Sequence, residues 1–236
     1  EYTTTTIKCK AFISTDGGSE VIEKGFCWTT DGTPTISDNH TNDGGGIGEF
    51  TTTITGLQPA TMYRVRAYAK NSVGISYSMP IVVVTDVEIS VTGQINGYDY
   101  VDLGLPSGLK WATCNVGAES YREYGNYYSW GELNPKENYN NSILYDVEIG
   151  DISGNANYDG ARADCGSTWR MPKQEEMQEL MDNCTFTLYV GVDVTGFVLT
   201  GPNGNYMFLP AAGSKWSTTF EGLNTNASYW TSSPVD

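Results

Sequence analysis

Trp169-Arg170-Met171-Pro172 and the segment that follows, Lys173–Asn183, decide the fold of the second half of this chain. Proline suits the first turn of a helix because its fixed φ is already helical and its missing N–H would have no partner there. Glu175 and Glu176 then fall in the first turn, where the helix dipole favours carboxylates. The pattern predicts a helix over Lys173–Asn183.

One face of this predicted helix is apolar. Its stripe repeats at i, i+3, i+4 and i+7 and consists of Met177, Leu180, Met181 and Cys184. This spacing is typical of an amphipathic helix, and burial of each large member stabilises the fold by about 1.5–3 kcal/mol. The strands of the second half are therefore expected to pack against this stripe.

The composition favours a β-rich protein with many turns. Of the 236 residues, 39% are hydrophobic and only 17% are charged, whereas glycine (27) and tyrosine (16) are abundant. The formal net charge is −15, which argues against nucleic acid as a partner because nucleic acid requires a positive patch. No apolar run approaches the ~18 residues of a membrane-spanning helix.

The first half contains short runs of alternating apolar and polar residues between glycine-rich turns, as in half-buried strands. The segment 57–74 resembles the fibronectin type III family, in which a Leu-x-Pro-x-x-x-Tyr corner, here Leu57 to Tyr63, leads into a strand that ends in Ala-x-Asn. The Tyr63 hydroxyl is expected to bond back to the preceding loop and clamp the corner. The resemblance implies an immunoglobulin-like β-sandwich over residues 1–86.

Residues 87–92 contain neither glycine nor proline, and we expect a short, stiff linker there. The domain after it, residues 93–236, contains motifs that resemble the Fibrobacter succinogenes major paralogous domain family. These motifs are Val101–Gly108, Trp111–Ala118, Tyr124–Glu132, Trp169–Pro172, Gly201–Asn205, Phe208–Gly213 and Tyr229–Ser233. The resemblance implies a C-type-lectin-like α+β domain on a secreted or surface-anchored bacterial protein.

Two further expectations follow from the resemblance. The Trp-Arg-Met-Pro element is also similar to formylglycine-generating enzymes, but their active-site cysteines have no counterpart in this sequence. The family usually continues past the Trp-Thr-Ser-Ser motif, Trp230–Ser233, into closing strands. We therefore expect an open edge on the strand at 98–105 unless another segment covers it.

The five cysteines are an odd number and include no Cys-x-x-Cys pair, so the commonest zinc and thioredoxin-type spacings are absent. They are Cys9, Cys27, Cys114, Cys165 and Cys184. Cys9 and Cys27 are expected on neighbouring strands, where a thiol pair and a disulfide are both open. The disulfide connectivity stays open.

The residue types that could support catalysis are not assembled in the sequence. His40 is the only histidine and lies in a polar loop of the first half, far along the chain from the serines Ser232 and Ser233. The glutamates of the predicted helix are interpreted as solvated charges rather than as a glycosidase pair; they are Glu175, Glu176 and Glu179. We expect no enzymatic activity.

The segment Asn155-x-Asn157-x-Asp159-Gly160 is similar to the start of a calcium-binding loop. Gly166 stands where the bidentate glutamate of such a loop belongs. We therefore expect no cofactor, with calcium kept as the alternative.

Aromatic residues in loop-like sequence are the candidate ligand contacts, because loops on a rigid scaffold commonly carry binding and aromatic rings stack on sugars and proteins. They are Tyr139, Tyr145, Tyr158, Trp216 and Phe220. The tryptophans inside the family motifs are expected in the core instead; these are Trp111, Trp130, Trp169 and Trp230.

The sequence thus predicts a non-catalytic bacterial cell-surface protein, secreted or lipid-anchored upstream of Glu1, that adheres to carbohydrate or to a host or surface protein. Two alternatives remain. A carboxylate-dependent hydrolase acting on glycans would place two buried carboxyl groups across an aromatic pocket. A structural surface or pilus component would expose a strand edge for a neighbouring chain. The oligomeric state stays open.

Overall fold

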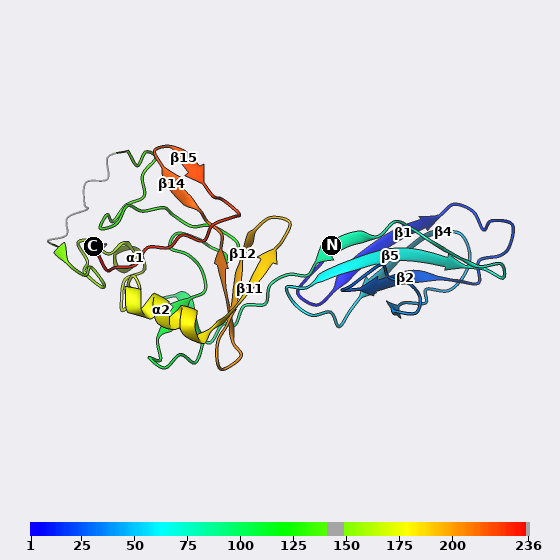
Figure 1. The fold of residues 1–236 in the computed structure, drawn as a ribbon, viewed down its shortest axis with the longest axis horizontal. Helices are drawn as coiled ribbons and strands as arrows, with labels where there is room; N and C mark the ends of the chain where they lie inside the picture. Colours follow the sequence, from blue (N-terminus) through cyan, green and yellow to red (C-terminus); the bar gives the residue numbers. More distant parts are fainter. Residues whose placement is uncertain (141–148, 235–236) are drawn as a thin grey trace. The chain divides into compact units, whose positions relative to one another are not determined.

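The structure, a computed structural model, describes residues 1–140 and 149–234. The chain divides into two compact units, Glu1–Glu88 (unit 1) and Ile89–Asp236 (unit 2) (Figure 1). The division falls inside the predicted linker 87–92. The Ser90 N–H donates to the Tyr206 carbonyl at 3.0 Å, so the end of that segment belongs to unit 2.

Unit 1 is a β-sandwich made of two antiparallel sheets, as predicted. One sheet pairs β1 (Ile7–Ile13) with β4 (Gly48–Ile54). The strands of the other sheet are β2 (Glu23–Thr29), β3 (Asn39–His40), β5 (Met62–Lys70), β6 (Ile75–Tyr77) and β7 (Ile81–Val84). Its order is β3-β2-β5-β6, with β7 also pairing with β5. Side chains from both sheets, such as Ile54 and Val65, meet in one buried core.

The tyrosine clamp predicted for unit 1 is confirmed. The Gln58 N–H donates to the Tyr63 hydroxyl at 3.0 Å, and Tyr63 is buried in the core. The hydrogen bond satisfies a backbone donor of the corner that precedes β5.

The cysteines of unit 1 lie on different sheets, because β1 pairs with β4 whereas β2 pairs with β3 and β5. The expectation that Cys9 and Cys27 occupy neighbouring strands is therefore wrong. All five cysteines of the chain are free thiols. Burial raises the pKa of the Cys9 thiol to about 11, so it stays protonated at neutral pH.

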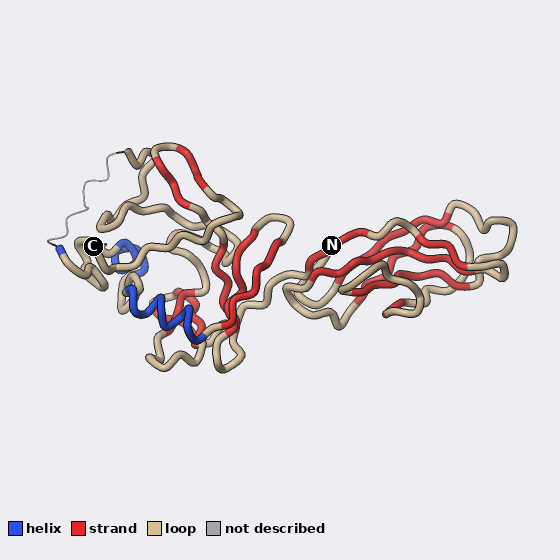
Figure 2. The backbone as a smooth tube through the Cα atoms, in the orientation of Figure 1, coloured by secondary structure: helices blue, strands red, loops and turns tan. Residues whose placement is uncertain are grey.

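The described residues of unit 2 form short strands, two α-helices and long loops. Its elements are β8 (Gly93–Ile95), β9 (Tyr98–Asp102), β10 (Lys110–Ala112), α1 (Gly160–Cys165), α2 (Gln174–Asn183), β11 (Thr185–Val190), β12 (Thr195–Thr200), β13 (Tyr206–Pro210), β14 (Ser214–Trp216) and β15 (Thr219–Glu221). Three antiparallel sheets result, with orders β10-β9-β8, β11-β12-β13 and β14-β15. Between β10 and α1 the described chain runs mainly through turns and loops (Figure 2).

The strand predicted at 98–105 has the covering segment that the prediction allowed for. Its regular part, β9, lies between β10 and β8. The strand β8 (Gly93–Ile95) folds back as a short hairpin and pairs with Tyr98–Tyr100, and β10 pairs with Tyr100–Asp102.

The predicted helix is confirmed as α2, which begins one residue later than expected. Leu180 is fully buried, and Met177 and Cys184 pack against the same core. Met181 is 59% exposed, so its place in the buried stripe was wrong. The apolar face that contacts the core is narrower than the i, i+3, i+4, i+7 pattern implied.

The segment before α2 is fixed by charged hydrogen bonds. The Arg170 guanidinium donates to both carboxylate oxygens of Glu176, at 2.7 and 2.6 Å, and the Lys173 N–H donates to Glu176 at 2.8 Å. Glu179 accepts from the backbone N–H of Ser107 at 2.8 Å. Two of the three helix glutamates therefore have structural partners, and the interpretation of Glu176 and Glu179 as solvated charges was wrong.

The loop that resembles a calcium site is organised by Asp159, which is fully buried. Its carboxylate accepts backbone N–H groups of Gly154, Arg162 and Met171 at 2.7 to 2.9 Å. Asp159 thereby caps α1 and ties the loop to the Trp-Arg-Met-Pro segment. Within residues 1–140 and 149–234, no group of three His, Cys, Asp or Glu residues is placed to hold a metal ion.

The Trp-Thr-Ser-Ser motif packs on the start of α2. The Ser232 N–H donates to the Pro172 carbonyl at 2.8 Å, and the Gln174 N–H donates to the Ser233 hydroxyl at 3.2 Å. Ser232 is fully buried. Both serines therefore have a packing role.

Candidate functional site

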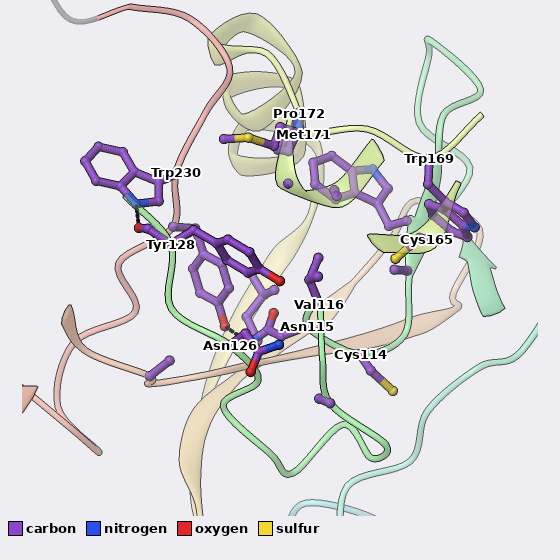
Figure 3. Close-up of a pocket in the computed structure, with 18 of the residues that line it drawn as sticks. Cys114, Asn115, Val116, Asn126, Tyr128, Cys165, Trp169, Met171, Pro172 and Trp230 are labelled. Atoms are coloured by element: carbon purple, nitrogen blue, oxygen red, sulfur yellow. Dashed lines mark hydrogen bonds between the residues drawn. The ribbon is translucent and has the colours of Figure 1, made fainter. Parts of the chain in front are cut away.

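Unit 2 contains a cavity of about 960 Å³, within the range of small-molecule sites. The sheet β10-β9-β8, the Trp-Arg-Met-Pro segment and the loops 113–132 and 212–230 contribute to its walls. Much of the lining is aromatic and includes Trp111, Tyr127, Tyr128, Trp169, Tyr229 and Trp230. In Figure 3, Trp230 and Trp169 lie on opposite sides of the cavity, with Tyr128, Asn126 and Asn115 between them.

The tryptophans of the cavity are held by their indole nitrogens. Trp169 Nε1 donates to the Ile95 carbonyl at 2.9 Å, and Trp230 Nε1 donates to the Tyr128 carbonyl at 2.9 Å. These bonds fix the ring planes and leave the ring faces for other contacts. Trp111 Nε1 is buried and has no hydrogen-bond partner among the described residues. It is a donor without an acceptor at the cavity wall.

Amide side chains add polar groups to the lining. Asn115 Nδ2 donates to the Tyr124 carbonyl at 3.0 Å and to the Tyr229 hydroxyl at 3.2 Å. Asn126 is exposed and packs over Gly117, where a Cβ atom would lie 2.1 Å from Asn126 Nδ2. Gly117 also has a φ of 76°, so glycine is required for this close approach.

The carboxylates of the cavity are mostly matched by donors. Glu176 is held by Arg170, whose hydrogen bonds lower the pKa of the Glu176 carboxyl, and Glu132 forms an ion pair with Lys136. Asp99 accepts a hydrogen bond from Gln94 at 2.6 Å. The lowered pKa of the Glu176 carboxyl is the opposite of the raised pKa that a glycosidase acid requires.

Two thiols also line the cavity, Cys114 and Cys165. Burial raises the pKa of both thiols, that of Cys165 to about 11. A thiol nucleophile requires the opposite shift, toward the thiolate. The thiols therefore contribute polarisable, uncharged surface.

The five aromatic residues predicted as ligand contacts do not form one site. Tyr139 lines the cavity but is buried, and its hydroxyl donates to the Tyr127 carbonyl. Tyr158 is half-buried in the loop before α1 and does not line the cavity. Tyr145 lies outside the described residues. Tyr139 is thus not the exposed loop aromatic that the sequence suggested.

The hairpin β14–β15 separates the other two predicted contacts. Lys215 pairs with Phe220 across the hairpin and Trp216 pairs with Thr219, so Phe220 and Trp216 project from opposite faces. Phe220 contacts Tyr127, with 5.1 Å between ring centroids. Trp216 is 67% exposed and does not line the cavity.

The sequence did not predict that tryptophans of the family motifs line the cavity. Trp111, Trp169 and Trp230 were predicted to lie in the core. Trp111 does pack against the core of unit 2, but all three tryptophans line the cavity, and Trp230 is 42% exposed. Trp130 alone of the four is almost fully buried. The available indication was their clustering in glycine- and asparagine-rich motifs, which are more typical of irregular loops than of a regular core.

No family model matches the chain, and no curated protein sequence matches it. Among solved structures, the chain is similar to the sixth fibronectin type III domain of human fibronectin type III domain containing protein 3. The two sequences are 22% identical, the match covers 39% of this chain and 82% of that chain, and the TM-score is 0.29. The chain is also similar to the twitchin kinase region of C. elegans, with 16% identity, a TM-score of 0.29 and coverage of 87% of this chain and 29% of that chain. Similarities of this strength leave the family open.

The helices of the described residues are short, and none combines the length and apolar character needed to cross a bilayer.

Proposed function

We propose that the chain is a non-catalytic, surface-located binding protein and that unit 2 recognises carbohydrate in the aromatic cavity. The observation that carries this proposal is the lining of tryptophan and tyrosine rings, interleaved with amide side chains such as Asn115 and Asn126. Sugar rings stack their apolar C–H faces on aromatic rings, while amides bond to hydroxyl groups. A C-type-lectin-like fold for residues 93–236 and the adhesive role belong to the same proposal.

A catalytic role has less support from the same residues. A hydrolase would need a carboxyl group kept protonated near neutral pH beside an ionised one. Glu176 and Glu132 are each bound to a cation instead, and the Cys114 and Cys165 thiols have raised pKa values. These carboxylates and thiols are therefore better suited to contacting a ligand than to transferring protons.

The test compares two tryptophans of unit 2 that differ in their relation to the cavity. The full chain is screened on a glycan array, and affinity for the best glycan is measured by calorimetry. Trp230→Ala removes one aromatic ring from the cavity lining. We expect it to weaken binding about tenfold or more, as truncation of an aromatic anchor does. Trp216→Ala is the matched control, and it should leave the affinity within about twofold.

The outcomes separate the parts of this proposal. Loss of binding on Trp216→Ala but not on Trp230→Ala would move the site to the exposed face of the hairpin β14–β15. Absence of any glycan binding by the parent chain would reject carbohydrate as the ligand. Thermal unfolding of both variants shows whether unit 2 is still folded.

We propose assembly with copies of the chain as a second candidate function, because β11 is an edge strand with an exposed apolar face. Phe186, Leu188 and Val190 alternate along it and are 39%, 59% and 57% exposed. The strand has no charged residue to discourage pairing with another edge. Sedimentation of the parent and of Leu188→Lys tests this: a dimer or polymer that Leu188→Lys dissociates supports assembly, and a monomeric parent rejects it.

A further inference from the structure

Three cationic side chains line the cavity of unit 2, and two of them are already neutralised. Lys110 pairs with Asp102, and Arg170 pairs with Glu176 at 2.6 Å. The third, Lys215, has no carboxylate within ion-pair distance among the residues that the structure describes. Lys215 is therefore the cavity cation whose charge is not neutralised by a described carboxylate.

Aromatic rings and one carbonyl hold the Lys215 ammonium in place. Its Nζ lies 5.1 Å from the ring centroid of Phe220 and 5.3 Å from that of Tyr139, and it donates to the Lys136 carbonyl at 3.3 Å. Cation–π contacts attract an ammonium without cancelling its charge. Because an ammonium has three N–H donors, donors remain for an incoming group.

A lysine without a carboxylate partner among the described residues is unusual in a chain with a formal net charge of −15. Most carboxylates that line the cavity have a donor of their own: Glu132 has Lys136, Glu176 has Arg170 and Asp99 has Gln94. Glu119 is exposed to solvent, where its charge is screened. An anion beside Lys215 would therefore complete an ion pair that the described residues leave open.

We infer that the cavity takes an acidic saccharide, whose carboxylate or sulfate group pairs with Lys215 while its ring stacks on the aromatic wall. This inference rests on the proposed function and specifies its ligand class. Charge-assisted hydrogen bonds are stronger than neutral ones, so the acidic group gives selectivity over neutral sugars, whereas the tryptophans give affinity for sugar rings in general.

The experiment uses an array that carries oligomers of glucuronate and galacturonate, sulfated galactose oligomers, the neutral glucose and galactose oligomers, and glucosamine oligomers. The full chain should bind an acidic oligomer about tenfold tighter than its neutral counterpart, and high salt should reduce this preference. The carboxylated and sulfated arms identify which anion is preferred.

Lys215→Met keeps an unbranched side chain that can pack on the rings, one atom shorter than lysine, but removes the charge. We expect it to bring the ratio of acidic to neutral affinity close to one, and Lys215→Arg to preserve the ratio. Lys10→Met in β1, which removes an exposed lysine paired with Glu49, is the control and should change nothing.

Failure of this inference differs from failure of the proposed function. If neutral or glucosamine oligomers bind best, or if Lys215→Met leaves the ratio unchanged, the acidic ligand is rejected while the aromatic site stands, provided that Trp230→Ala still weakens binding. If no oligomer binds to the parent, both are rejected. Thermal unfolding of each variant confirms that unit 2 is folded.

Discussion

Units 1 and 2 use their aromatic side chains in opposite ways. In unit 1, Phe26 and Phe50 pack with 5.0 Å between ring centroids inside the sandwich, and Tyr63 clamps a corner. In unit 2, Trp169 and Trp230 bond to backbone carbonyls through their indole nitrogens, and their rings line a cavity. The same residue class thus fills the core of one unit and lines a cavity in the other.

The difference follows from backbone regularity. A two-sheet sandwich sends alternate side chains to a single interior that closes by packing. In unit 2 the described residues between β10 and α1 form turns and loops and contribute no strand. Aromatic rings from these loops line an open volume rather than interdigitating in a core. Loops on a scaffold are where binding residues gather.

The largest expected effect comes from breaking the scaffold of unit 2 beneath the cavity. Leu180 is fully buried at the centre of its core, and Leu180→Ala should reduce the free energy of unfolding by about 2–5 kcal/mol. Urea unfolding followed by tryptophan fluorescence reports mainly on unit 2, because Trp28 is the one tryptophan of unit 1. Met181→Ala, at a 59% exposed site of the same helix, should stay within about 0.5 kcal/mol. Equal losses would contradict the packing described for α2.

A smaller effect is expected from the ion pair that fixes the Trp-Arg-Met-Pro segment. Hydrogen bonds from Arg170 lower the pKa of Glu176 in the folded chain, below the usual value of about 4.3. The stability from this shift is present above pH of about 4.3 and is lost as pH falls through the folded pKa. Glu176→Gln should destabilise unit 2 at neutral pH and flatten its acid dependence. Chemical unfolding at several pH values measures this, and the exposed Glu175→Gln should keep the parent profile.

The smallest of these effects concerns the clamp of unit 1. Tyr63→Phe leaves the ring in the core but removes the acceptor of the Gln58 N–H. We expect a loss of about 1 kcal/mol in the stability of unit 1. Amide hydrogen exchange resolves the two units, with faster exchange expected at Leu57, Gln58 and Ala60 and unchanged exchange in unit 2. Protection that stays the same at 57–60 would show that the clamp contributes no stability.

Local patterns predicted several elements well. The proline and the two glutamates of its first turn fixed the start of α2 to within one residue, because these preferences depend on the backbone alone. The corner around Tyr63 was also predicted, since its hydrogen bond spans five residues. The prediction that Met181 is buried was wrong because helical spacing shows which residues share a face of the helix. It does not show how much of that face the neighbouring core covers.

The sequence by itself determined the β-rich character, the sandwich of unit 1, the helix α2 and the excess of negative charge, because each depends on composition or on periodicity along a short stretch. Only the tertiary structure decided where the cavity lies. Trp111, Trp169, Trp230 and Lys215 are separated by up to 119 residues and come together through contacts between loops and sheets. Such long-range contacts leave no period in the sequence, and the direction of a ring or an ammonium group depends on the partners that it meets.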